Sequence, residues 1–313
     1  MKKITLLFIP FLLFFPSLSV AVGGNFYDNT NNDKRALLLS EISHLDIKSI
    51  VTKIVNAYLN KQTIIEFDDN LKSEEAKIIQ EEVINILSSS QGKIIGYKAA
   101  LTNPRSQKKF NVNQPLLGIL LEKMLLPSGS TISPNFGAQP MIEGDLMVRV
   151  SSEKINEATT PQETLKYLDA VIPFLELPDL VYDENIKVNG AMLTAINVGA
   201  RFGIVGDFIK LNQQTATTNS LKNISVTLRD ESGKIIGQGN SNTLLGDPLN
   251  VVFWIKEELK TQDKTLKKGD LLSLGSITPL IPIETQKMIT AQYTSLENDE
   301  VRKIMVSFEQ INQ

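Results

Sequence analysis

The stretch PMIEGDLMVRV, residues 140–150, alternates apolar and other side chains over its second half and therefore predicts a β-strand. Side chains two positions apart on a strand share a face, so Glu143 and Asp145 project together while Ile142 and Leu146 face the other way. Two neighbouring carboxylates repel each other unless a cation lies between them or one keeps its proton. Oxygen ligands of this kind suit magnesium, manganese or calcium. Taken alone, the pair also fits an exposed acidic strand edge.

A third acid follows in VIPFLELP, residues 171–178. This run is otherwise apolar and typical of a strand, so Glu176 is expected to be buried. Burial is costly for a carboxylate unless the group is paired or binds a metal. Convergence of Glu143, Asp145 and Glu176 on one cation would explain all three placements. Spacing along the chain does not by itself show that they converge.

Helices are predicted mainly before this region. Apolar residues recur at three- and four-residue spacings over residues 34–60, as in one long or two short amphipathic helices. A second helix is expected from Ser73 to Leu87, with Ser73 as its cap. After Gly92 the chain changes to strand-like segments separated by glycine, proline and asparagine, beginning with a strand at residues 93–98.

Two further helices are expected within this β-rich part. One begins near Pro161 and continues through Val171. The other begins at Asp247-Pro248, where the aspartate can cap the helix and the proline suits its first turn. A helical front followed by a mainly β body predicts an α+β protein.

The N-terminal residues have the pattern of a secretory signal. Met1-Lys2-Lys3 precedes an apolar run too short to cross a bilayer, and Ser19-Val20-Ala21 offers the small residues that signal peptidase requires. We expect cleavage after Ala21 and a periplasmic or secreted protein with no membrane span; an uncleaved anchor is the alternative. The predicted segments are a signal peptide, a flexible leader, a helical N-terminal region and a catalytic body, at residues 1–21, 22–33, 34–92 and 93–313.

Composition excludes several classes of function. The chain has no cysteine and a single histidine, His44, which excludes disulfides, cysteine-based metal sites and multi-histidine zinc sites and disfavours histidine-dependent catalytic triads. His44 lies in a helical-looking segment far from the other motifs and is expected on the surface of a helix. The net charge of −3 gives no basic face for a nucleic acid.

Several motifs, taken in order, resemble a known family. They are GYKAALT at 96–102, QPLLG at 114–118, IEGD at 142–145, PFLE at 173–176, AINVG at 195–199, GQG at 237–239, LGDPLN at 245–250, and KGD at 268–270 leading to GSITP at 275–279. Together they resemble the 2-keto-4-pentenoate hydratase and 2-oxo-3-hexenedioate decarboxylase family of the fumarylacetoacetate hydrolase superfamily. The resemblance extends from about Lys34 to Phe308. It implies that the body has the mixed β-sheet and β-roll of the fumarylacetoacetate hydrolase C-terminal-like fold.

The resemblance also implies a metal site. Glu143, Asp145 and Glu176 match the three metal-binding acids of the family and would hold Mg²⁺ or Mn²⁺. The middle acid is usually glutamate in the hydratases. Aspartate keeps the charge and shortens the reach by one methylene group, so the affinity or the choice of metal would differ.

Three further residues match active-site positions of the family. Lys98 matches a lysine that serves as acid and base or anchors the substrate carboxylate, although a strand lysine taken alone is more often solvated. Ser276 and Thr278 match positions that hydrogen-bond this carboxylate, although alone they would indicate an ordinary turn. Leu116 departs from the pattern, because many hydratases carry an acid there. This departure would weaken hydration chemistry.

The expected function is that of an exported, divalent-metal-dependent hydratase, which would act as a homo-oligomer on a short 2-oxo or 2-hydroxy-dienoic acid through a metal-bound enolate. Superfamily members that hydrolyse carbon–carbon bonds generally use a histidine, so hydrolysis is disfavoured here. A 2-oxo-acid decarboxylase is one alternative, because it uses the same enolate. The other is a periplasmic binding or interaction protein that keeps the fold without turnover; export, Leu116 and Asp145 favour this alternative.

Overall fold

The computed structural model describes residues 47–68, 70–211, 221–283, 287–296 and 301–309, all within one unit, Asp46–Gln313. The expected signal peptide, the leader, His44 and the first part of the predicted helical segment therefore lie outside the described residues.

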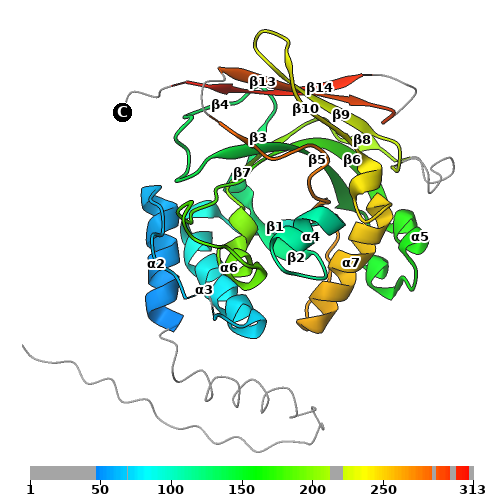
Figure 1. Ribbon diagram of the computed structural model, residues 1–313. Helices are drawn as coiled ribbons and strands as arrows, with labels where there is room; N and C mark the ends of the chain where they lie inside the picture. Colours follow the sequence, from blue (N-terminus) through cyan, green and yellow to red (C-terminus); the bar gives the residue numbers. More distant parts are fainter. Residues whose placement is uncertain (1–46, 69, 212–220, 284–286, 297–300, 310–313) are drawn as a thin grey trace, which may run out of the picture. The chain divides into compact units, whose positions relative to one another are not determined.

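The described residues confirm the α+β class (Figure 1). The α-helices are α2 (Ile47–Asn60), α3 (Ser73–Gln91), α4 (Pro104–Lys109), α5 (Pro161–Thr164), α6 (Gly190–Ala195) and α7 (Pro248–Thr261). Short 3₁₀ helices are η1 (Glu122–Met124), η2 (Glu153–Glu157), η3 (Leu165–Tyr167), η4 (Asn197–Gly199) and η5 (Ser241–Thr243). The strands are β1 (Ile94–Ala100), β2 (Leu116–Leu121), β3 (Leu125–Pro127), β4 (Thr131–Ile132), β5 (Met141–Val150), β6 (Leu168–Leu177), β7 (Phe202–Val205), β8 (Ile209–Lys210), β9 (Ser225–Asp230), β10 (Ile235–Asn240), β11 (Leu271–Ser273), β12 (Ile281–Pro282), β13 (Met288–Thr294) and β14 (Arg302–Phe308).

The larger sheet places β5 near its centre, in the order β2-β1-β11-β5-β6-β7-β3, with β12 beside β5 and β8 beside β6 (Figure 1). β5 runs antiparallel to both β6 and β11, whereas β1 runs parallel to β11. This mixed, curled sheet brings segments far apart in the chain side by side. The expected strand at residues 93–98 is confirmed as β1, and the expected strand at residues 140–150 as β5.

The second sheet, in the order β10-β9-β13-β14-β4, covers one face of the larger sheet (Figure 1). A Cβ atom added to Gly144 would lie 2.8 Å from the Val226 side chain of β9, so the two sheets are in close contact there. The Tyr293 hydroxyl of β13 lies 3.0 Å from the main-chain oxygen of Asp145 and 2.5 Å from that of Phe174. The second sheet thus fixes the backbone of β5 and β6 from the face opposite Glu143.

Helices form where the sequence supplies both a cap and an apolar stripe. The carboxylate of Asp247 accepts a hydrogen bond from the Leu249 N–H at 2.9 Å, as expected for the cap of α7. The apolar stripe of α7 is fully buried, and it consists of Val251, Val252, Ile255 and Leu259. Among the described residues, no helix is sufficiently long and apolar to cross a membrane.

Two predicted helix boundaries were wrong. Ser73 is the first residue of α3 rather than its cap; Lys72 holds the cap position, and its N–H donates to the Glu75 carboxylate at 2.9 Å. The helix expected from Pro161 to Val171 ends after one α-helical turn and one 3₁₀ turn, and β6 begins at Leu168. Pairing of β6 with β5 over most of its length outweighs the weak local helical pattern.

The sequence also gave no indication of α4 and α6, which have six residues each. Their caps are asparagine side chains: Asn103 accepts from the Ser106 N–H at 2.9 Å and Asn189 accepts from the Met192 N–H at 3.0 Å. Elements this short show less than two turns of apolar periodicity, so pattern alone does not identify them.

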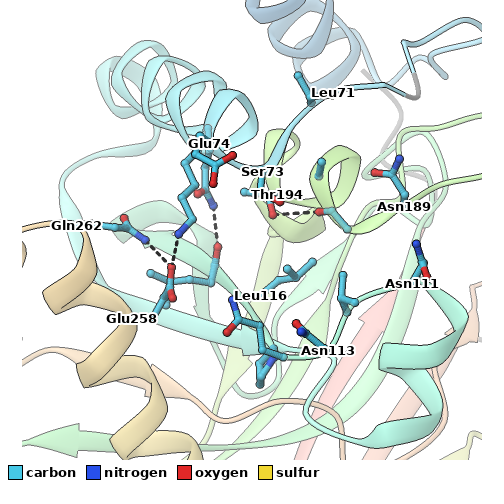
Figure 2. Close-up of a pocket in the computed structure, with 18 residues that line it drawn as sticks. Leu71, Ser73, Glu74, Asn111, Asn113, Leu116, Asn189, Thr194, Glu258 and Gln262 are labelled. Carbon is cyan, nitrogen blue, oxygen red and sulfur yellow. Dashed lines mark hydrogen bonds and ion pairs between the residues drawn. The ribbon is translucent and has the colours of Figure 1, made fainter. Parts of the chain in front are cut away.

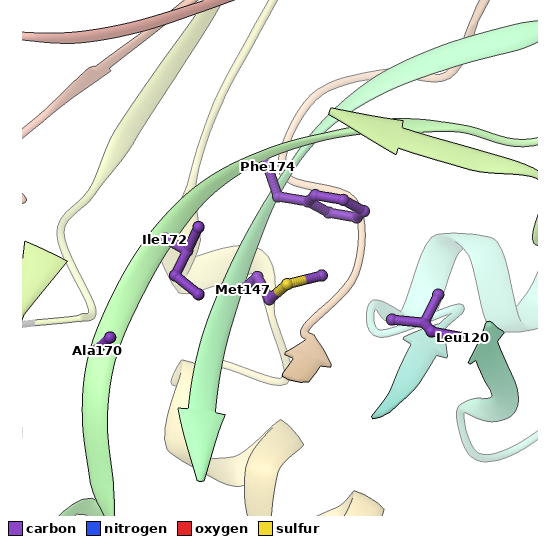
Figure 3. Packing of buried hydrophobic residues seen from close by; sticks show 5 residues of the cluster. All are labelled: Leu120, Met147, Ala170, Ile172 and Phe174. Carbon is purple, nitrogen blue, oxygen red and sulfur yellow. The ribbon is translucent and has the colours of Figure 1, made fainter. Parts of the chain in front are cut away.

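A hydrophobic cluster fills the sheet face that also carries Glu143 and Asp145 (Figure 3). Met147 lies two residues beyond Asp145 on β5, and Phe174 lies two residues before Glu176 on β6. The complete cluster comprises Leu120, Met147, Ala170, Ile172 and Phe174. Asp145 and Glu176 are therefore buried beside apolar packing, whereas Glu143 is partly exposed.

Candidate active site

Strand register brings the predicted acids and Lys98 together. Glu143 on β5 pairs directly with Glu176 on β6, and Asp145 follows two residues later on the same face. Lys98 lies on β1, one strand beyond β11, and pairs with Ser273. Three strands, β1, β5 and β6, thus bring four ionisable side chains to the same part of the sheet.

Lys98 is buried and has two partners. Its ammonium forms an ion pair with the Glu176 carboxylate and donates to the main-chain oxygen of Val198 at 3.1 Å. Only 2 % of Lys98 and 3 % of Glu176 are exposed, so solvent screens this pair weakly. The structure therefore excludes the alternative of a solvated strand lysine.

Asp145 is completely buried beside β11. Its carboxylate accepts hydrogen bonds from the Ser273 hydroxyl and from the Leu146 N–H, each at 2.5 Å. Burial raises the pKa of Asp145 well above its usual range; the charge of Glu176 adds to this rise, and the hydrogen bonds from Ser273 and Leu146 oppose it. An exposed acidic strand edge is therefore excluded as well.

Glu143 shows the same conflict between burial and charge. Burial, followed by the charge of Glu176 and a hydrogen bond between the two carboxyl groups, raises the pKa of Glu143 to about 8. Lys98 and the hydroxyl of Ser276 act in the opposite direction. Without a cation, the cluster therefore retains a proton near neutral pH.

The acids have the chemistry of a divalent-cation site without being preassembled as one. In the part of the chain that the structure describes, no three acid, histidine or cysteine side chains are grouped closely enough to hold a metal ion. Glu176 is drawn toward Lys98, and its Oε2 atom is buried without a hydrogen-bond donor. Hard oxygen donors, mutual repulsion and this unsatisfied oxygen all suit a small divalent cation. The residues present therefore fit such an ion.

The two predicted hydroxyl residues lie in different places. Ser276 is near Glu143, where its hydroxyl lowers the pKa of that acid, and it also donates to the main-chain oxygen of Thr278. The Thr278 hydroxyl accepts from the Gly144 N–H at 2.9 Å, and its methyl group lies on the Gly144 face of β5. The structure thus brings Ser276 to the acids and Thr278 to the strand backbone.

Several residues of the site were missed from the sequence. Ser273, which bonds Asp145, follows two leucines at the end of a three-residue strand and gave no signal. Asn197 and Val198 lie within the AINVG motif, but nothing in that motif showed that their turn would contact Lys98. Gln80, on α3, donates to the Asn197 side chain at 3.0 Å. Only the three-dimensional pairing of distant segments reveals these contacts.

Two cavities flank the segment that follows β1. One, of about 690 Å³, lies between α3, α6 and the start of β2 and includes Gln80 and Leu116 in its wall. Figure 2 shows Glu258 there, which accepts hydrogen bonds from Lys77 and Gln262. The other, an open groove of about 860 Å³, includes Ser276. Arg105 is the sole charged side chain among the described residues that line this groove.

Comparison with known proteins finds distant relatives over most of the chain. No family model matches the chain. A 2-keto-4-pentenoate hydratase of Paraburkholderia phymatum is 22% identical over 254 residues, which cover 80% of this chain and 94% of the hydratase. A 4-oxalocrotonate decarboxylase of Pseudomonas putida is 22% identical over 275 residues, which cover 88% and 99% of the two chains.

Solved structures show the same fold. The 4-oxalocrotonate decarboxylase of Pseudomonas putida G7, complexed with magnesium and adipate, superposes with a TM-score of 0.74 at 22% sequence identity, and the match covers 84% of this chain and 97% of that one. In sequence and in fold the chain is therefore similar to the 2-keto-4-pentenoate hydratases and 4-oxalocrotonate decarboxylases.

Proposed function

We propose that this protein is a divalent-metal-dependent lyase that hydrates a short 2-oxo or 2-hydroxy-dienoic acid. The observation that carries the proposal is the buried ion pair of Lys98 and Glu176 beside Glu143 and Asp145. Ionisable groups with strongly perturbed pKa values, here Glu143 and Asp145, cluster at functional sites. The hydratases and decarboxylases among its relatives support the choice of reaction.

Glu143, Asp145 and Glu176 are the residues that would hold the cation, either Mg²⁺ or Mn²⁺. The related decarboxylase of Pseudomonas putida G7 has been solved with magnesium and with calcium, which supports an oxygen-ligated ion of this kind. When bound, the cation supplies a positive charge that stabilises the negative charge developing on the substrate oxygens.

The protein's own groups would move the proton. Lys98 gives a proton from its Nζ atom to the conjugated carbon chain, or takes one from it, while Glu176 and the Val198 carbonyl hold the ammonium in place. Ser276 binds the substrate carboxylate beside Glu143. The hydrophobic cluster formed by Met147 and Phe174 with their neighbours excludes bulk water from the acids. Water adds to the alkene once the proton has moved.

Decarboxylation of a dicarboxylic 2-oxo acid is the second candidate, and the groove beside Ser276 favours it. Arg105 is exposed there, where its guanidinium can bind the distal carboxylate of a substrate whose 2-oxo end lies at Ser276. A monocarboxylic dienoate would leave Arg105 without a partner from the substrate.

Ultraviolet assays with magnesium distinguish these candidates. Hydratase activity consumes 2-hydroxypenta-2,4-dienoate, whereas decarboxylase activity consumes 2-oxo-3-hexenedioate and releases carbon dioxide. Arg105→Gln should raise KM for the dicarboxylate without changing KM for the monocarboxylate. Lys108→Gln, which removes an exposed charge from the same helix, is the control. Metal-bound protein that consumes neither compound would refute both candidates and support a binding protein.

A further inference from the structure

The turn at residues 197–198 directs a main-chain oxygen at Lys98. We propose that Gln80 and Asn197 are positioning residues, which hold this turn so that the Val198 carbonyl fixes the Lys98 ammonium for proton transfer. The inference rests on the proposed role of Lys98 and adds two residues that do not touch the substrate.

The turn has an unfavourable backbone conformation. Asn197 and Val198 have φ angles of 54° and 53°, in the left-handed region. This region is accessible to asparagine and is strongly disfavoured for a β-branched residue such as valine. A strained conformation of this kind persists only where the surrounding structure determines it.

Two carboxamide side chains provide that support. The Asn197 amide accepts from the Ile119 N–H and donates to the Ile119 carbonyl, both at 2.8 Å, as a neighbouring strand would. The Gln80 Nε2 group donates to the Asn197 Oδ1 atom at 3.0 Å and to the Leu117 carbonyl at 2.8 Å. Asn197 and Gln80 are 2 % and 4 % exposed, so water does not replace these bonds without rearrangement.

The lysine stem passes through a narrow space beside the same turn. Lys98 pairs with Gly118 of β2, and a Cβ atom at Gly118 would lie 2.6 Å from Lys98 Cγ and 3.3 Å from the Asn197 carbonyl oxygen. The stem is therefore confined between β2 and the turn. Movement of the turn would release both the stem and the ammonium.

Movement of the turn, which frees the Lys98 side chain, should affect the chemical step rather than substrate binding. Without the Val198 carbonyl, Lys98 keeps Glu176 as its partner and loses the contact that sets its direction. Small displacements of a reacting group reduce rates strongly, by up to about 10²-fold for a shift near 1 Å. The substrate contacts and the three acids stay in place, so KM and metal affinity should change little.

The decisive experiment compares two asparagines with matched bonding. Asn197→Ala should lower kcat by roughly 10- to 100-fold, with KM and magnesium affinity changed less than about threefold. The control is Asn156→Ala, because Asn156 donates to the Leu266 carbonyl at 2.9 Å and accepts from its N–H at 3.0 Å, far along the chain from Lys98. It should lose comparable stability and keep its kcat. Equal kcat values in the two variants would overturn the proposal.

A second-site rescue separates positioning from general stability. Adding Val198→Gly to Asn197→Ala should recover part of the lost kcat, because glycine adopts the left-handed conformation without strain. Failure of the added glycine to recover any kcat would contradict the proposed role of the turn. If Asn197→Ala does not fold, Gln80→Met, of similar volume, replaces it and should show a smaller fall in kcat at unchanged KM.

Crystal structures of these variants provide a test that does not depend on turnover. In Asn197→Ala or Gln80→Met, the Val198 carbonyl should move out of hydrogen-bonding distance of Lys98. An unchanged turn with the Lys98 contact intact would overturn the positioning role even in an inactive protein. Absence of turnover in the wild type, with the turn released in the variants, would instead refute the proposed function alone.

Discussion

At the scale of single residues, the acids of the site are under electrostatic conflict. Glu143, Asp145 and Glu176 are crowded into apolar surroundings with one ammonium among them. The Lys98 ammonium alone cannot neutralise three carboxylates. The cluster therefore either keeps protons or binds a further positive charge. The raised pKa values of Glu143 and Asp145 mean that, without a metal ion, these two acids tend to keep their protons.

Removing one acid should therefore weaken metal binding without weakening the metal-free fold. Glu143→Gln lowers the affinity for magnesium by at least about 10-fold, the order expected for loss of a charged ligand or of its close partner. The melting temperature in the presence of a chelator should stay the same or rise, because a buried repulsion is removed. Isothermal calorimetry and thermal unfolding measure the two effects. Glu153→Gln, at an exposed acid, is the control, and unchanged magnesium binding in Glu143→Gln would refute the assignment.

The same groups predict a pH dependence for the metal-free protein. The pKa of Glu143 is raised from 4.5 in the unfolded chain to about 8 in the fold, so the folded state binds more protons between these values. The contribution of Glu143 to stability is therefore fully present below pH 4.5 and is lost as pH rises toward 8. Asp145 acts in the same direction. Melting temperatures with a chelator should fall over this window more steeply for the wild type than for Glu143→Gln; parallel curves would contradict the shift.

At the scale of elements, the sequence predicted the helices and strands that are stabilised by residues within or next to them. The alternation in β5 and the Asp247 cap of α7 are such cases. The start of β6 was misplaced because its conformation depends on pairing with β5, and the local pattern near Pro161 carries no information on that pairing.

The site likewise combines features that local sequence determines with features that depend on strand pairing. That Glu143 and Asp145 share a face follows from strand alternation alone. The pairing of Glu143 with Glu176, and the approach of Lys98 across β11, depend on strand order, which local patterns do not contain. Residue patterns singled out the three acids, and family resemblance assigned them and Lys98 to one site. The support from Gln80 and Ser273 became visible only in three dimensions.

One prediction belongs to the contact between β1 and β2. Gly118→Ala places a methyl group against the Lys98 stem, where Cγ would lie 2.6 Å away. Overpacking of this kind costs about 1–3 kcal/mol of stability, and displacement of the lysine should also lower kcat. Gly237→Ala on β10 is the control, because its closest neighbour would be the flexible end of Ile281 at 3.1 Å. Equal kcat values for the two variants, measured beside their unfolding free energies, would show that Gly118 does not confine the lysine.

At the scale of the whole molecule, the prediction of export depends on the N-terminal sequence pattern alone. The homo-oligomer suggested by the family resemblance likewise stays a prediction. Both concern how the catalytic body is delivered and assembled rather than what its site does.

Export makes a direct prediction about the mature chain. Signal peptidase should cut after Ala21, so mass spectrometry of protein from its natural source should show Val22 as the first residue. The measurement compares intact masses of the cell-associated and exported fractions. A full-length chain that begins at Met1 and stays in the cytoplasm would contradict export, and a membrane-bound full-length chain would support the uncleaved anchor.

The central claim is that a metal-dependent lyase centred on Lys98 operates in this fold. Its most direct test is the rate of dienoate consumption, with magnesium saturating, in the wild type, Lys98→Met and Lys93→Met. Lys98→Met should lose at least about 10²-fold in turnover while remaining folded, because general acid and base catalysis contributes roughly 10²–10⁴-fold. Lys93→Met, at an exposed lysine five residues earlier, should keep the wild-type rate. A Lys98→Met protein that is folded, binds magnesium and turns over as fast as the wild type would contradict the account.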